Sequence, residues 1–201
     1  ILEFVMNLTQ AYHARVMSDN FESSLKQLEI LDALDNLLKF LSKPPKSLIF
    51  RKKKTMQGIY LYGPVGSGKT FLMDLFFEHL PISRKLRFHF LHWMQDIDAQ
   101  LRHLQGEQDP LERIADNLAQ SAQVICVDEF MVEDPGQAMI LLKLLDLLFY
   151  RGVILVATSN MRPDDLYPNG IQRNRFLKAI DLIKSHCVLM TLDVGRDYRL
   201  A

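Results

Sequence analysis

Short apolar runs alternate along most of the chain with longer segments of mixed polarity. Five of these runs are rich in β-branched and aliphatic residues and have the length of one buried strand: 58–62, 86–91, 124–127, 153–158 and 188–192. The segments between the runs are long enough for helices. Because strands that alternate with helices are typical of a parallel sheet, we predict an α/β fold for this part of the chain.

The segments between the predicted strands carry helix boundary signals. A helix over 70–80 ends at Pro81, and Asp134 followed by Pro135 predicts the N-cap and first residue of a leucine-rich helix that ends at Tyr150. We expect two further helices between the second and third strands, at 92–105 and 111–122.

A different pattern precedes the first predicted strand. Between Leu25 and Leu41, leucines recur at spacings of three and four, which predicts an amphipathic helix. The polar segment after it, with four consecutive basic residues at 51–54, is typical of a solvated connector. We therefore divide the chain into an N-terminal helical segment with a connector, 1–57, and an α/β core, 58–201.

Composition narrows the classes of function. The 201 residues are enough for a sizeable core, and 24 Lys and Arg balance 24 Asp and Glu, so no overall positive field points to nucleic acid or an anionic membrane. The most apolar long stretch, 139–157, is interrupted by charged residues and does not have the pattern of a membrane span, and we recognise no signal peptide. Cys126 and Cys187 lie in aliphatic runs, where we expect them to act as small core residues.

The loop after the first predicted strand matches the phosphate-binding pattern G-x-x-x-x-G-K-[ST] over 63–70. Its glycines let the backbone wrap around an anion at the N-terminus of the next helix. Lys69 would reach the β and γ phosphates of ATP, and the Thr70 hydroxyl would bind Mg²⁺. The candidate nucleotide-binding residues are Gly63, Pro64, Val65, Gly66, Ser67, Gly68, Lys69, Thr70 and Phe71.

The third predicted strand ends in two acidic residues, Asp128 and Glu129. In a parallel sheet this end lies at the carboxyl edge, beside the phosphate-binding loop. Asp128 can hold a Mg²⁺-bound water there, and Glu129 is suited to polarise the attacking water as general base.

The fourth predicted strand ends in small polar residues at the same edge. Asn160, with Thr158 and Ser159 as lesser candidates, would contact the γ-phosphate or the attacking water. Ordinary turn chemistry before Pro163 is the alternative interpretation.

These motifs together resemble those of the AAA+ ATPases, in which GPVGSGKT is Walker A, VDEF is Walker B and ATSN is sensor 1. Longer segments, from GIYLYGPVGSGKTFLMDLFF to the final DYRL, are similar to the AFG-like ATPases within that superfamily. The resemblance runs from Gly58 to the end of the chain. It implies a five-stranded sheet of order 5-1-4-3-2, which would place Lys69, Asp128 and Asn160 side by side.

The same resemblance implies an arginine finger at Arg173 or Arg175, acting on the nucleotide of a neighbouring subunit. A guanidinium there would stabilise charge on the γ-phosphoryl oxygens. Similarity to other AAA+ segments favours Arg175, and two solvated arginines at a helix start are the alternative. A finger that acts between subunits requires a homo-oligomer, a hexamer in this family.

The resemblance also implies a cellular role. It implies Mg²⁺-dependent ATP hydrolysis coupled to remodelling of a protein partner in bacterial cell division, in the cytoplasm with peripheral association at the inner membrane. Mitochondrial relatives imply inner-membrane protein quality control as an alternative. A nucleotide-gated binding scaffold and a DNA-processing ATPase are further alternatives, although we expect no direct nucleic-acid contact because the charge balance is neutral.

The sequence departs from the AAA+ pattern after its core. A helical lid with a further arginine, sensor 2, usually follows, and we expect none before Ala201. Trp93 falls near the position of a substrate-gripping aromatic, but we expect it to pack in the core. His89 and His92 lack the acidic or thiol neighbours of a metal site, and we interpret them as structural.

Overall fold

The computed structural model describes residues 8–19, 25–42 and 56–192. The basic run at 51–54 and the final DYRL segment lie outside the described residues.

Five parallel strands form one sheet of order β2-β3-β4-β1-β5. The strands are β1 (Gly58–Tyr62), β2 (Lys85–His89), β3 (Val124–Asp128), β4 (Ile154–Ser159) and β5 (Cys187–Thr191). The α/β fold class and the expected order 5-1-4-3-2 are both confirmed. Strand β4 lies at the centre and pairs with β1, so the loops that follow these two strands are next to each other at the carboxyl edge.

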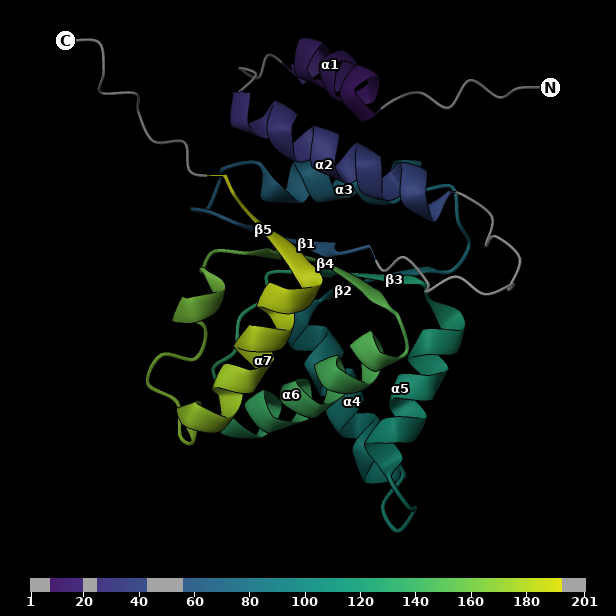
Figure 1. The fold of residues 1–201 in the computed structure, drawn as a ribbon, viewed down its shortest axis with the longest axis vertical. Helices are drawn as coiled ribbons and strands as arrows, with labels where there is room; N and C mark the ends of the chain where they lie inside the picture. Colours follow the sequence, from purple (N-terminus) through teal and green to yellow (C-terminus); the bar gives the residue numbers. More distant parts are fainter. Residues whose placement is uncertain (1–7, 20–24, 43–55, 193–201) are drawn as a thin grey trace.

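Helices cover both faces of the sheet (Figure 1). One face carries α1 (Leu8–Asp19), α2 (Leu25–Leu41) and α3 (Lys69–His79). The other carries α4 (Phe90–His103), α5 (Pro110–Ser121), α6 (Pro135–Tyr150) and α7 (Arg173–His186). A short 3-10 helix, η1 (Pro163–Asp165), precedes α7.

Each face of the sheet has its own hydrophobic core, because successive strand residues point to opposite sides. Ile59 and Leu61 of β1 pack with Leu72 and Phe76 of α3 and with the buried leucines of α2. Tyr60, between them, packs on the opposite side with α4 and α6 residues. Helix α2 therefore buries its apolar stripe in the core that α3 and β1 also form.

Most predicted elements are confirmed within one or two residues, and β1 and α2 have the predicted bounds. The second strand is shorter than predicted, because α4 begins at Phe90 directly after His89. Phe90 is buried against Phe130, with ring centroids 4.8 Å apart, so tertiary packing favours the earlier helix start. Helix α1 was not predicted.

Several local predictions are also confirmed. The Asp134 side chain accepts a hydrogen bond from the Gln137 backbone N–H at 2.9 Å, as an N-cap does. Trp93 is buried and stacks on Phe88, so it is a core residue. Both cysteines are free and buried.

Candidate nucleotide site

The phosphate-binding loop connects β1 to α3 and contains two glycines in the left-handed region. Gly66 has φ 78° and Gly68 has φ 94°, values that residues with a side chain rarely adopt. Helix α3 begins at Lys69, immediately after the loop, so its first unpaired N–H groups lie beside the glycine backbone. This arrangement can bind the phosphate groups of a nucleotide.

The Lys69 side chain is folded into this loop. Its Nζ donates to the backbone oxygens of Gly63 and Pro64, both at 2.7 Å, and to Ser67 Oγ at 3.4 Å. Burial lowers the pKa of Lys69 below its ordinary value, and the charge of Glu129 partly opposes this shift. A phosphate in the loop would offer Nζ charged acceptors, which form stronger hydrogen bonds than these carbonyls.

Asp128, at the end of β3, is held from both neighbouring strands. Its Oδ1 accepts a hydrogen bond from Thr158 Oγ1 of β4 at 3.3 Å, and its Oδ2 accepts from Arg87 Nε of β2 at 2.6 Å. Burial lowers the pKa of Arg87, but its hydrogen bonds to Asp128 and Asp74 outweigh that effect, so the pKa lies above its ordinary value. The carboxylate is therefore fixed in direction at the edge of the sheet.

Glu129 adopts a strained backbone conformation, with φ 54°. Its backbone N–H and its side chain both have partners: the N–H donates to Thr158 Oγ1 at 3.3 Å, and Oε2 lies 2.9 Å from His89 Nε2. The two Walker B acids thus share Thr158 as a support. Thr158, a lesser candidate for contact with the γ-phosphate, thus supports the two acidic residues in the structure.

His89 is a site residue that the sequence analysis missed, because it was interpreted as structural. The parallel pairing of β2 with β3 places His89 opposite Asp128, one residue before Glu129. One signal in the sequence could have revealed it. His89 lies near the end of the second predicted strand, and the expected sheet order places that strand beside the third, which ends in Asp128 and Glu129.

The polar residues at the end of β4 differ in their surroundings. Ser159 is buried, donates from Oγ to the Phe130 backbone oxygen at 2.7 Å and accepts from the Met161 N–H at 3.1 Å. Asn160 is exposed and directly follows β4, which lies between β1 and β3. Asn160 therefore follows the strand that lies between β1, which leads into the phosphate-binding loop, and β3, which ends at Asp128.

The two candidate finger residues have different surroundings. Arg173 donates to three backbone oxygens, those of Asp164 at 2.7 Å, Leu166 at 2.6 Å and Tyr167 at 2.9 Å. Arg175 is exposed and donates to Gln172 Oε1 at 2.9 Å. Arg173 braces the segment before α7, whereas the guanidinium of Arg175 lies at the surface.

The candidate Mg²⁺ ligands are the Thr70 hydroxyl, at the exposed start of α3, and the Asp128 carboxylate. Both are oxygen donors, the ligand type that Mg²⁺ prefers, and Mg²⁺ in nucleotide sites is held largely by phosphates and water. The part of the chain that the structure describes contains no cluster of three or more His, Cys, Asp or Glu side chains suited to a metal ion. The donor set therefore fits Mg²⁺ brought with a nucleotide.

Residues 6–201 match the family described as AFG1-like ATPase. The chain belongs to that family. It is 53% identical over 149 residues to the cell division protein ZapE of Escherichia coli K12, a match that covers 74% of this chain and 40% of ZapE. It is 42% identical over 154 residues to lactation elevated protein 1 homolog B of Danio rerio, covering 71% of this chain and 31% of that protein. The matches therefore span less than half of either relative.

Solved structures with the same fold include three proteins at low sequence identity. DnaA of Aquifex aeolicus aligns with a TM-score of 0.64 at 14% identity, covering 99% of this chain and 53% of DnaA. The DnaC helicase loader aligns at 0.61 and 14% identity, over 94% and 97% of the two chains, and DnaI at 0.60 and 17% identity, over 87% and 86%. This likeness shows that the AFG1-like chain shares its fold with these three proteins.

Proposed function

We propose that this AFG1-like chain binds Mg–ATP and hydrolyses it at the carboxyl edge of its sheet. The observation that carries the proposal is the meeting of three strand ends: the loop of Lys69 after β1, Asp128 and Glu129 at β3, and Asn160 after β4. A phosphate cradle beside a paired Asp and Glu is suited to transfer of the γ-phosphoryl group to water.

In this mechanism the loop N–H groups and Lys69 bind the phosphates and hold the γ-phosphoryl group in place. Glu129 orients a water molecule and accepts its proton at a carboxylate oxygen, while the water oxygen bonds to the γ-phosphorus and the bond to the bridging oxygen breaks. Asn160 would contact the γ-phosphate or that water. Mg²⁺, when bound by Thr70 and through water by Asp128, would offset the phosphate charge.

His89 adds a constraint on the base. Its Nε2 lies 2.9 Å from Glu129 Oε2, so it holds the carboxylate that is to receive the proton. Movement of one partner away from the other would change how Glu129 faces the water. The contact thus makes the orientation of the base depend on the position of β2.

We further propose that Arg175 completes the site of a neighbouring subunit in a homo-oligomer, a hexamer by family resemblance. An exposed guanidinium at the start of α7 is available to a neighbour, and its planar donors match phosphoryl oxygens. Arg173, which donates to three carbonyls of its own chain, is the weaker candidate.

The 53% identity to the cell division protein ZapE supports a role in bacterial cell division. From the family resemblance we also propose that hydrolysis is coupled to remodelling of a protein partner. We propose a cytoplasmic location with peripheral membrane association. None of the helices among the described residues is long and apolar enough to cross a membrane. The balanced charge does not favour a direct nucleic-acid partner.

The proposal is tested by ATP turnover as a function of protein concentration, with Glu129→Gln and Arg175→Ala alongside the unchanged chain. We expect specific activity to rise with concentration and to fall at least about a hundredfold in each variant. A mixture of the two variants should regain part of the activity, because some interfaces then combine an intact base with an intact finger.

Concentration-independent turnover that survives Arg175→Ala would refute the shared site. The nucleotide-gated scaffold is separated by assaying partner function in Glu129→Gln. If that function survives the loss of hydrolysis, ATP binding alone acts as the switch.

A further inference from the structure

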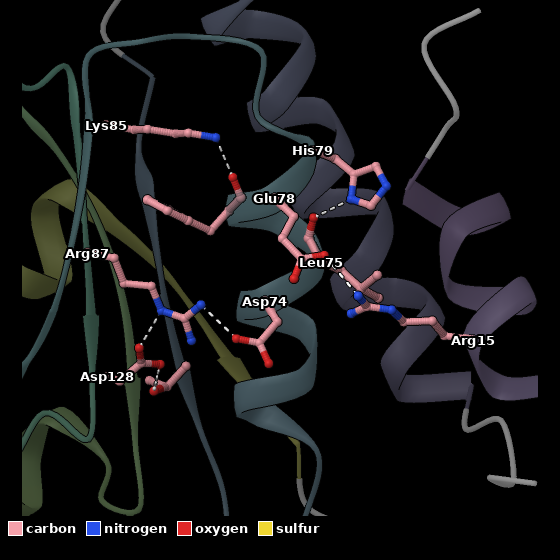
Figure 2. A network of polar contacts seen from close by, with 10 residues as sticks. Arg15, Asp74, Leu75, Glu78, His79, Lys85, Arg87 and Asp128 are labelled. Atoms are coloured by element: carbon pink, nitrogen blue, oxygen red, sulfur yellow. Dashed lines mark hydrogen bonds and ion pairs between the residues drawn. The ribbon is translucent and has the colours of Figure 1, made fainter. Parts of the chain in front are cut away.

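Arg87 links strand β2 to acidic side chains on two other elements (Figure 2). Its Nε donates to Asp128 Oδ2 and its Nη1 lies near Asp74 Oδ1, both at 2.6 Å. Asp128 ends β3, and Asp74 lies on α3. Because the guanidinium is planar and its donor directions are fixed, one arginine holds both carboxylates in a defined relative geometry.

Asp74 lies on the same helix as Thr70, one of the two residues proposed to bind Mg²⁺. It lies four residues after Thr70 on α3, and residues four apart lie on the same face of a helix. The two protein ligands proposed for Mg²⁺ come from α3 and β3, and Arg87 contacts both of these elements. The spacing between the elements therefore depends in part on this contact.

The surroundings of Arg87 keep it in one place. Its side chain is 23% exposed, and its Cζ lies 5.9 Å from the centroid of the Phe77 ring on α3, within the range of a cation–π contact. The second oxygen of Asp128 accepts from Thr158. The Asp128 carboxylate is thus held from β2 on one side and from β4 on the other.

The positive charge of Arg87 does not by itself favour Mg²⁺ binding, because a guanidinium repels Mg²⁺. An outer partner that hydrogen-bonds a ligating carboxylate instead fixes the direction of its free lone pairs. With Arg87 on Oδ2 and Thr158 on Oδ1, Asp128 has only limited directions left for a metal-bound water.

We propose that Arg87 is a positioning residue for Mg–ATP, which orients Asp128 relative to the Thr70 face of α3 through its second contact with Asp74. This inference rests on the proposed Mg–ATP site and adds a residue that neither the sequence motifs nor the family comparison assigns. Arg87 touches neither nucleotide nor metal in this proposal, and acts through Asp128.

The test measures how strongly Mg²⁺ tightens the binding of a fluorescent, non-hydrolysable ATP analogue to the full 201-residue chain. The Kd of the analogue is measured in EDTA and in Mg²⁺. The Kd in EDTA divided by the Kd in Mg²⁺ gives a ratio that is compared between proteins. We expect Arg87→Met to lower this ratio about tenfold, the range seen for outer-shell partners of metal ligands. The Kd in EDTA should change little, because the phosphate-binding loop is intact.

Three variants separate positioning from general stabilisation. Arg15→Met removes the ion pair between Arg15 and Glu78, which also joins another element to α3, and should leave the ratio unchanged. Asp74→Ala removes the α3 contact alone and should give a smaller fall in the ratio. Arg87→Lys keeps the charge but cannot hold two carboxylates in fixed directions, and should remain impaired.

The outcomes distinguish the inference from the proposed function. If the unchanged chain shows no Mg²⁺-dependent binding, the Mg–ATP site itself is refuted. If it does, and folded Arg87→Met keeps the ratio, only the inference is refuted. Full recovery in Arg87→Lys, or an equal fall in Arg15→Met, would likewise overturn it. If Arg87→Met does not fold, Asp74→Ala decides in its place.

Discussion

The two arginines at the start of α7 are two residues apart, yet they have different hydrogen-bond partners in the structure. Arg173 satisfies the carbonyls of Asp164, Leu166 and Tyr167, which lie in and after η1. Arg175 contacts a single side-chain oxygen, that of Gln172. This difference gives the proposed finger a stability test as well as an activity test.

We predict that Arg173→Ala lowers the free energy of unfolding by about 2 kcal/mol, because it leaves three carbonyls without their charged donor. Arg175→Ala should change that free energy by no more than about 0.5 kcal/mol, as expected at an exposed site. Turnover should fall about a thousandfold in Arg175→Ala, the scale of a lost arginine finger. Urea unfolding and ATP turnover measured on both variants check this.

The opposite pattern would reverse the assignment. If Arg175→Ala unfolds early while Arg173→Ala keeps its fold but loses turnover, Arg173 is the finger. An arginine that braces its own chain would then also reach a neighbour.

At the scale of elements, the first residue of strand β1 packs closely against the neighbouring strand β4. A Cβ added to Gly58 would lie 1.8 Å from the backbone oxygen of Leu155 in β4, and backbone cannot move aside as a flexible side chain does. Strand β1 leads directly into the phosphate-binding loop. A shift of β1 would therefore displace the loop as well.

We predict that Gly58→Ala lowers the free energy of unfolding by about 3 kcal/mol, at the upper end of overpacking costs. Gly106→Ala is the matched control, since its Cβ would meet nothing within 4 Å and only its φ of 93° is unfavourable. It should cost about 1 kcal/mol. Equal losses in the two variants, measured by urea unfolding, would contradict close packing at Gly58.

At the scale of the whole molecule, the sheet joins two cores. Cys126 belongs to the core shared with α1, α2 and α3, and Cys187 to the core shared with α4 to α7. Burial raises the pKa of each thiol to about 12. Because the thiolate is the reactive form, both thiols should be inert to an aromatic disulfide reagent in the native protein near pH 8.

We predict that both thiols become reactive in one transition as urea increases, since the same strands carry residues of both cores. Pulsed thiol labelling measures this, and Cys126→Ala and Cys187→Ala variants assign the two signals. Earlier labelling of Cys126 would mean that the core shared with α1 and α2 opens by itself. That result would favour the N-terminal segment 1–57 as a unit that unfolds independently of 58–201.

Much of the fold was accessible from the sequence because its signals are local. The leucine spacing from 25 to 41, the Asp134–Pro135 start of α6 and the apolar runs of the strands depend on residues near one another in the chain. Helix α1 was missed because its buried residues, Leu8, Ala11 and Tyr12, form too short an apolar pattern to stand out. The end of β2 was misplaced because the alternation in 85–90 fits a longer strand as well.

The phosphate-binding loop and the acidic pair at 128 and 129 were likewise determined by the sequence, since their residue types and spacing carry the chemistry within a few positions. What only the tertiary structure decided involves partners far apart in the chain. Arg87 and His89 contact Asp128 and Glu129, which lie 41 and 40 positions later in the chain, because β2 and β3 pair in parallel. The sequence does not show the register of this pairing. For Arg173 and Arg175, family resemblance favoured Arg175, but only the folding of η1 against α7 separates a bracing arginine from an exposed one.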